Sequence, residues 1–177
     1  MFTATPRYFV RLSPGIPLAC VLFVLPGCGG DDSPPTNVAG TYTLNVTNGP
    51  STCPLGGWMP GNVTMDVPLV ITQNGSSVTA DVGGAGAVFL KLYCGNAHLE
   101  GSVSGSNMEL KLTGTRSRSS GSCAFTIDAH LSATVGNDAL SGSITYTPNT
   151  NTSPDCAAVN TCSARMNLNG TRPPPSQ

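Results

Sequence analysis

Apolar and polar residues alternate with a period of two along most of the chain between residues 38 and 170. In the longest run, 124–135, Phe125, Ile127 and Leu131 occupy one set of positions, and Thr126 and His130 occupy the other. Successive side chains of a β-strand point to opposite faces, whereas a helix would scatter both sets around its axis. Eight segments share this pattern and are predicted to be strands: 38–47, 67–71, 78–82, 99–103, 108–112, 124–135, 140–146 and 164–170.

The connections between these segments are alternately short and long. Three are turns rich in Gly, Asn and Ser, a composition typical of tight hairpins: 74–76, 105–107 and 136–138. The other four are long: 48–65, 84–97, 116–122 and 148–161. Successive connections of an antiparallel meander fall at opposite ends, so the long loops would share one end. An even strand number lets the last strand pair with the first. The sequence therefore predicts an all-β, eight-stranded antiparallel up-and-down barrel, with a β-sandwich as the alternative.

Residues 87–94 complicate this arrangement, because they are also apolar enough to form a strand. A ninth barrel strand would make the two terminal strands parallel and would break the alternation of loop lengths. We therefore expect a short strand within the second long loop, and no helix from residue 38 onward.

The N-terminus has the features of an export signal. Arg7 and Arg11 precede a short apolar run at 16–25, which is too short to span a bilayer as a helix. The run ends in Leu25-Pro26-Gly27-Cys28, which resembles the lipobox of bacterial lipoproteins, although Pro26 departs from the usual small residue. The resemblance implies cleavage before Cys28 and lipidation of that cysteine. An uncleaved apolar anchor is the alternative.

This resemblance also implies a domain organisation and a location. Residues 1–27 would be the signal peptide and 28–37 a lipidated flexible tether. A barrel domain at 38–172 and a disordered Pro-rich tail at 173–177 would follow. Gly29 is not the aspartate that retains lipoproteins in the inner membrane, so the family rule implies the outer membrane, with the lipid as the membrane contact.

The barrel pattern is similar to that of the calycins, the superfamily that includes the lipocalins. Calycins carry Gly-x-Trp on the first strand and a basic residue on the last, which packs across the aromatic ring at the closed end. Here Gly40-Thr41-Tyr42 occupies the first place, with Tyr for Trp, and Arg172 follows the inward register of the last strand. The resemblance implies that Arg172 covers Tyr42, and that the interior holds either side chains or one small apolar ligand.

Composition narrows the function classes. The net charge is −1, so there is no electrostatic reason to expect a nucleic-acid partner. Seven cysteines in 177 residues indicate an oxidising compartment. Five of them would gather at the long-loop end and form two disulfides and one thiol: Cys53, Cys94, Cys123, Cys156 and Cys162. We expect Cys156 to pair with Cys162, because they share a loop, and the other three to compete for the second bridge.

No catalytic, cofactor-binding or metal-binding motif is evident in the sequence. His98 with Glu100, and Asp128 with His130, share polar strand faces and could bind a metal weakly, but a solvated outer face is the simpler interpretation. No Ser, Cys or Thr nucleophile with a positioned base can be nominated. We therefore expect a protein that is not an enzyme and has no cofactor.

The candidate binding residues lie in the long loops. Trp58 lies in the glycine-rich segment Gly56-Gly57-Trp58-Met59-Pro60-Gly61. There it would either contact a binding partner or cover the apolar barrel end as a lid. Arg116 and Arg118 lie in another long loop. We expect a non-catalytic module that binds an envelope protein or other partner through this loop end. The alternatives are a carrier of a small apolar ligand inside the barrel and, more remotely, a hydrolytic enzyme.

Overall fold

The computed structural model describes residues 35–173. Strands make up most of this part of the chain, and the helical segments all lie between strands. The elements in chain order are β1 (Gly40–Ser51), β2 (Val63–Asn74), β3 (Ser77–Val82), α1 (Gly84–Tyr93), β4 (His98–Ser104), β5 (Asn107–Leu112), β6 (Arg118–Ser120), β7 (Cys123–Gly136), β8 (Ala139–Thr150), the 3-10 helix η1 (Pro154–Cys156), α2 (Ala157–Asn160) and β9 (Ala164–Thr171).

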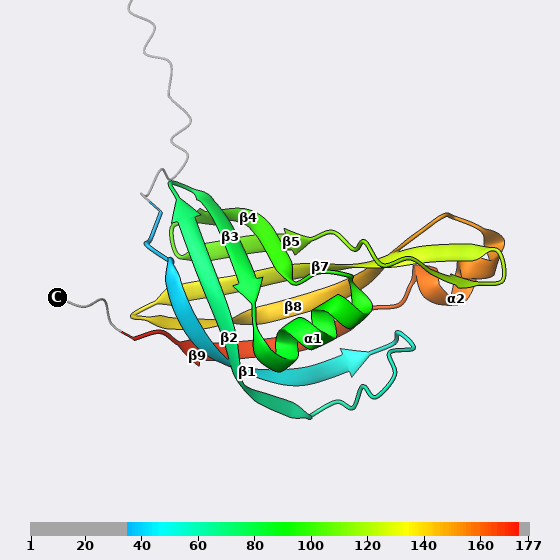
Figure 1. Ribbon diagram of the computed structural model, residues 1–177, viewed down its shortest axis with the longest axis horizontal. Helices are drawn as coiled ribbons and strands as arrows, with labels where there is room; N and C mark the ends of the chain where they lie inside the picture. Colours follow the sequence, from blue (N-terminus) through cyan, green and yellow to red (C-terminus); the bar gives the residue numbers. More distant parts are fainter. Residues whose placement is uncertain (1–34, 174–177) are drawn as a thin grey trace, which may run out of the picture. The chain divides into compact units, whose positions relative to one another are not determined.

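Eight of the strands form a closed antiparallel barrel (Figure 1). Strands β1 to β5 pair in sequence, β5 then pairs with β7, and β8 and β9 lead back to β1. The β5–β7 pairing runs from Asn107 opposite Thr134 to Leu112 opposite Ala129. Closure by this pairing and by β1–β9 confirms the predicted barrel, and the β-sandwich alternative is wrong. The short strand β6 lies outside the barrel and pairs only with the start of β7.

The alternation seen in the sequence corresponds to the inside and outside of the barrel. On the second half of β7, Ala129, Leu131 and Ala133 are buried, whereas His130 and Ser132 are exposed. The same contrast holds along β5, where each exposed residue is followed by a buried one. Burial of these apolar faces removes hydrocarbon from water and is the main driving force for closing the sheet.

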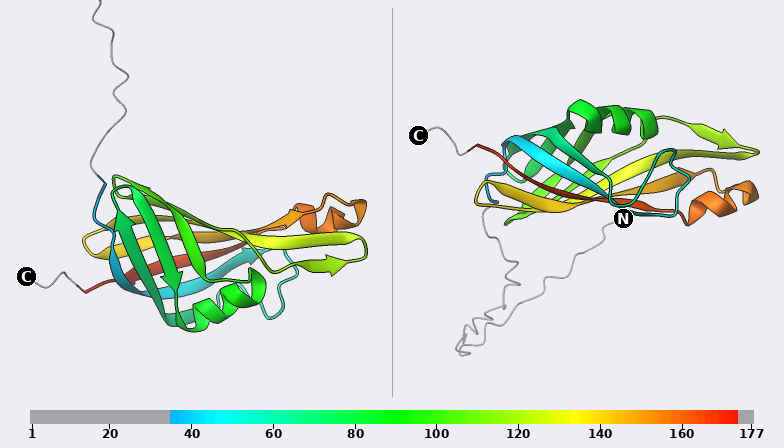
Figure 2. Two further views of the ribbon diagram at one scale, coloured as in Figure 1. Left: turned by 45° about the horizontal axis from the view of Figure 1, so that its top comes forward. Right: turned by 90° about the horizontal axis from the view of Figure 1, so that it is seen from below.

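The loop lengths divide the barrel into two ends, as predicted. The turns β2–β3, β4–β5 and β7–β8 are short and form the short-turn end. The four longer connections form the other, here called the loop end, and contain α1, β6, η1 and α2. Strands β7 and β8 continue past the rest of the barrel at the loop end and carry β6, η1 and α2 on a projection (Figure 2).

Helix α1 corrects two expectations: residues 87–94 do not form a strand, and the region beyond residue 38 does contain helix. Within α1, Leu90 and Tyr93 are buried and Phe89 packs against the core, whereas Val88 and Leu92 are exposed. This three- and four-residue spacing is that of a helix with one face on the barrel. The prediction failed because a short apolar run does not by itself distinguish helix from strand.

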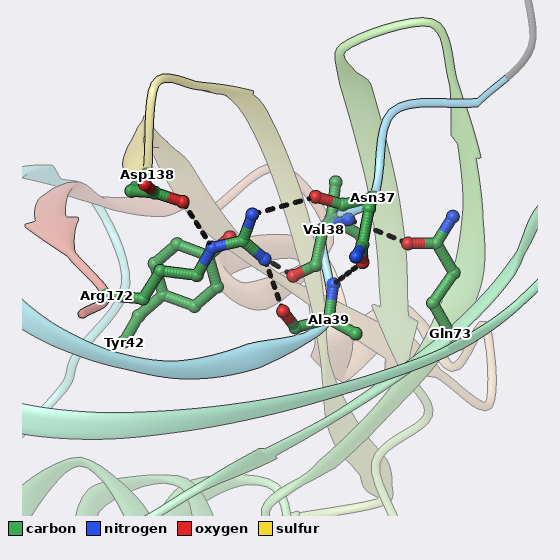
Figure 3. A network of polar contacts seen from close by, with 7 residues as sticks. All are labelled: Asn37, Val38, Ala39, Tyr42, Gln73, Asp138 and Arg172. Carbon is green, nitrogen blue, oxygen red and sulfur yellow. Dashed lines mark hydrogen bonds and ion pairs between the residues drawn. The ribbon is translucent and has the colours of Figure 1, made fainter. Parts of the chain in front are cut away.

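The short-turn end is closed by Tyr42 and Arg172, as the calycin resemblance implied (Figure 3). Tyr42 is fully buried, and the guanidinium carbon of Arg172 lies 5.5 Å from its ring centroid. Arg172 Nε donates to Asp138 Oδ1 at 2.9 Å, and the other guanidinium nitrogens donate to the carbonyls of Asn37 and Ala39. One side chain thereby joins the chain before β1, the β7–β8 turn and the end of β9.

Gly40 in the Gly-x-Tyr motif has a steric role at this end. Its φ of 142° lies in a region that residues with a side chain rarely adopt. A Cβ atom at this position would also approach Arg172 Cδ to 3.1 Å. A side chain at this position would therefore strain the backbone and require Arg172 to shift by a few tenths of an ångström.

The segment that enters β1 is held against the same end. The amide of Val38 donates to Gln73 Oε1 at 2.7 Å, and the amide of Thr36 donates to the Gly105 carbonyl at 2.9 Å (Figure 3 shows the first of these). Gln73 lies at the end of β2 next to the β2–β3 turn, and Gly105 lies in the β4–β5 turn. The described chain thus begins and ends at the short-turn end (Figure 1).

Several predictions concern residues outside the described range. These are the signal peptide at 1–27, the lipobox with Cys28, most of the tether at 28–37, and the tail beyond residue 173. Within residues 35–173, no helix has the length and hydrophobicity needed to cross a bilayer.

Candidate functional site: a cavity at the loop end

The inside of the barrel is not completely filled by side chains. A cavity of about 400 Å³ lies at the loop end, between the inner wall of the barrel, α1 and the β1–β2 loop. Ligand-binding pockets in proteins commonly span roughly 300–1,000 Å³. The inner wall is apolar and comes from β1, β2, β7, β8 and β9, with Leu44, Leu69, Leu131, Ile144, Tyr146 and Met166 among its residues.

Helix α1 forms one side of the cavity. Phe89, Leu90 and Tyr93 face the cavity, and the Phe89 and Tyr93 rings lie 4.6 Å apart between centroids. The end of the helix is attached to the β5–β7 connection, because the amides of Thr115 and Arg116 both donate to the Cys94 carbonyl. The helix is therefore fixed to the barrel at this end as well as through its apolar face.

Trp58 forms another part of the cavity mouth. Its Nε1 donates to the Gly49 carbonyl at 3.0 Å, and its ring lies 5.9 Å from Phe89 and 6.1 Å from Tyr146 between centroids. The Tyr93 hydroxyl donates to the Gly56 carbonyl at 2.8 Å and so connects α1 to the same loop. Of the two alternatives for Trp58, this geometry corresponds to the lid, with part of the indole still accessible to solvent.

The two arginines expected to bind a partner lie in different surroundings. Arg118 stacks on the Tyr93 ring, with its guanidinium carbon 4.8 Å from the centroid, and its Nη2 donates to the Leu92 carbonyl. Arg116 is exposed. Neither residue is among those that line the cavity; Arg118 contacts the end of α1, whereas Arg116 lies in solvent.

Two disulfides join the loops at this end, and their pairing differs from the expected one. Cys53 is bonded to Cys162 and Cys123 to Cys156, so the predicted Cys156–Cys162 bridge is wrong. The two cysteines of the β8–β9 connection are bonded to different strands' ends, one on each side of the β8–β9 pair. Its first cysteine lies beside the start of β7, the neighbour of β8, and its second lies beside the end of β1, the neighbour of β9. The cysteine pairing is therefore set by which strands are adjacent in the barrel, and not by closeness in sequence.

The fifth cysteine at this end, Cys94, is a buried thiol. Burial raises its pKa to about 12, and the charge of Asp128 adds to this while Arg118 opposes it. The thiolate is the nucleophilic form of cysteine, so a thiol with this pKa is unreactive near neutral pH. Cys94 is thus part of the packing beneath α1.

The histidine pairs noted in the sequence lie on the outer surface of the barrel. His98 Nδ1 lies 2.8 Å from Asp81 Oδ1 and its Nε2 lies 3.4 Å from Glu100 Oε1. His130 pairs with Glu109, and Asp128 with Lys111, so His130 and Asp128 are not partners. Among residues 35–173, no group of three His, Cys, Asp or Glu side chains is placed to hold a metal ion.

Sequence reasoning missed three of the residues that shape the cavity: Phe89, Tyr93 and Tyr146. Helical spacing at 86, 89, 90 and 93 was a signal for the first two, but the alternating pattern elsewhere favoured a strand. The alternation along 140–146 puts Tyr146 on the same face as Leu140 and Ile144, but it gives no sign that the residue borders empty space.

Comparisons with family models, curated proteins and solved structures find no match for this chain.

Proposed function

We propose that this protein is a lipid-anchored envelope protein that binds a small apolar ligand in the cavity at the loop end of its barrel. The observation that carries the proposal is the cavity of about 400 Å³, bordered by apolar residues of the strands, by α1 and by Trp58. An interior filled by its own side chains would have excluded a ligand. The proposed activity is binding without catalysis.

The relation to the calycins and the lipid anchor belong to the same proposal. The Tyr42–Arg172 contact at the short-turn end supports a calycin relationship. Lipidation at Cys28 would hold the protein at the outer membrane through a tether that enters at the short-turn end, so the cavity mouth would point away from that membrane. Labelled palmitate should enter the native chain but not Cys28→Ser, and incorporation into the variant would contradict the anchor.

The cavity can be tested by blocking its mouth from α1. Ala85 lines the cavity and is exposed, so Ala85→Trp should place a large ring over the mouth without disturbing the core. Val88, on the same helix, is 68% exposed and does not line the cavity, so Val88→Trp is the matched control. The purified protein is titrated with the neutral fluorescent probe N-phenylnaphthylamine.

We expect the native protein and Val88→Trp to bind this probe alike, and Ala85→Trp to bind it at least about tenfold more weakly, which corresponds to roughly 1.4 kcal/mol. Equal binding by all three proteins would place the probe elsewhere and contradict the proposal.

A second candidate function is contact with another envelope protein. Two exposed apolar residues, Val63 and Leu92, line the cavity, and further large apolar side chains are exposed on the elements that carry them and on the loop before β2: Met59, Met65 and Val88. Isolated exposed apolar residues are common, but a group of them can mark an interaction site. Pull-down from envelope extracts with native protein and with Val88→Glu would test it: a partner lost only with the variant supports this function, and equal capture contradicts it.

A further inference from the structure

The cavity lining has a property that restricts the chemistry of its ligand. Among the described residues that line it there is no Asp, Glu, Lys, Arg or His. A carboxylate or ammonium group inside such a cavity would have no counter-charge, and burying an unpaired charge is strongly unfavourable. The lining therefore disfavours ligands that would place a charged group inside the cavity, such as a short fatty acid.

The cavity wall also contains a hydroxyl group with a poor partner. Tyr146 is 2% exposed, and its hydroxyl contacts Met166 Sδ at 3.5 Å, the only hydrogen-bond partner that it has among the described residues. A thioether sulfur is a weak acceptor. Both side chains line the cavity. Burial raises the pKa of Tyr146, so the hydroxyl keeps its proton at physiological pH and remains a donor.

The other tyrosine of the cavity provides a contrast. The Tyr93 hydroxyl already donates to the Gly56 carbonyl at 2.8 Å, a strong acceptor. The polar side chains of Asn48, Asn62 and Thr64 also line the cavity, but Asn62 and Thr64 are exposed and Asn48 is only half-buried. Tyr146 is thus the buried donor whose hydrogen bond a ligand could improve.

We propose that the ligand is an uncharged apolar molecule with an oxygen acceptor, such as a ketone, ester or ether, and that this oxygen accepts a hydrogen bond from Tyr146. The inference rests on the proposed function and specifies its ligand class. The Trp58 and Phe89 rings, which lie against Tyr146, would contact the apolar part of the ligand.

The experiment uses three probes with equal carbon number: methyl hexyl ketone, octane and octanoate. Each is titrated against the native protein by displacement of N-phenylnaphthylamine, with the fluorescence of Trp58, the single tryptophan of the chain, as a second readout. We expect the ketone to bind at least about 100-fold more tightly than octanoate at neutral pH, because octanoate would bury its charge.

Two variants separate the hydrogen bond from packing. Tyr146→Phe removes only the hydroxyl and should weaken the ketone about fivefold while leaving octane unchanged. Tyr93→Phe is the control and should change both probes by the same factor, because its hydroxyl is already paired within the protein.

The outcomes distinguish this inference from the proposed function. If octanoate binds as tightly as the ketone, or if Tyr146→Phe weakens octane as much as the ketone, the inference is overturned while the cavity remains a binding site. If N-phenylnaphthylamine and all three probes fail to bind the native protein, the proposed function is overturned together with the inference.

Discussion

The two ends of the barrel are closed by different means. At the short-turn end, Arg172 lies across the fully buried Tyr42, bonds to Asp138 and donates to two backbone carbonyls. At the loop end, α1 and the Trp58 loop lie over the opening, two disulfides hold the loops, and a cavity remains. Short turns bring the strands together at one end, whereas long loops need crosslinks because they have little core of their own.

This difference assigns separate roles to the two ends. The short-turn end uses directional hydrogen bonds to fix the first and last strands to each other, and so completes the barrel. The loop end uses covalent bonds at its margins, which leaves its apolar centre free of the side chains that would otherwise be needed to hold it together. The disulfide variants and Arg172→Ala test that division.

The largest effect is expected from the disulfide Cys53–Cys162. It closes a span of 109 residues, against 33 for Cys123–Cys156. In the chain-entropy description, removing the longer crosslink by Cys53→Ser with Cys162→Ser costs about 4–5 kcal/mol, and removing the shorter one with Cys123→Ser and Cys156→Ser costs about 1 kcal/mol less. Urea unfolding of the two double variants measures this difference.

Hydrogen exchange on the same proteins checks where the loss occurs. In either double variant, amides of the loop end should exchange through local opening. Amides around Tyr42 should still exchange only through global unfolding. Early exchange at the short-turn end would show that the two ends are not independent.

A smaller effect is expected from Arg172→Ala. The side chain is 14% exposed, and its loss leaves Asp138 without its partner and two carbonyls without their donor. We expect a loss of about 2–3 kcal/mol in the free energy of unfolding. Arg165→Ala on the exposed face of β9 is the control and should change stability by less than about 0.5 kcal/mol.

The same variant tests the separation of stability and binding. Because Arg172 lies at the end opposite the cavity, N-phenylnaphthylamine should bind the folded Arg172→Ala protein with unchanged affinity. A large loss of affinity in protein shown to be folded would mean that the short-turn end controls the cavity.

The smallest effect on stability is expected from His98, which lies on the outer face of β4 and pairs with Asp81 on β3. Its hydrogen bond to Asp81 raises its pKa above the ordinary value of 6.5, with a smaller contribution from the charge of Glu100. The fold thus favours the protonated form, so this contribution is fully present below the ordinary value and is lost as the pH rises through the raised one.

We therefore expect a slight fall in melting temperature across that pH interval, kept small because the pair is solvated. In an NMR titration, Asp81→Asn should lower the His98 pKa more than Glu100→Gln does. The reverse order would contradict the assigned hydrogen bond.

The predictions from sequence succeeded where the signal was local. The alternation of apolar residues in β7 and β5 corresponds to inside and outside, and the turn at Asn137 and Asp138, both with positive φ, is a tight hairpin. They failed where the answer depended on neighbours distant in sequence. Helix α1 was predicted as a strand because its apolar residues satisfy both periods over so short a length. The predicted disulfide partners were wrong because Cys156 lies beside the start of β7 and Cys162 beside the end of β1, so the two cysteines have different neighbours.

The sequence by itself thus determined the number of barrel strands, the facing of their side chains and the gathering of five cysteines at one end. These follow from the two-residue period of a strand and from turn lengths, whereas the Tyr42–Arg172 contact was implied by the resemblance to the calycins. Only the tertiary structure decided which cysteines bond, that α1 covers the opening, and that a cavity remains beside Tyr146. Empty volume is what is left after residues from β1, β2, α1, β8 and β9 have taken their places, and no local pattern encodes that remainder.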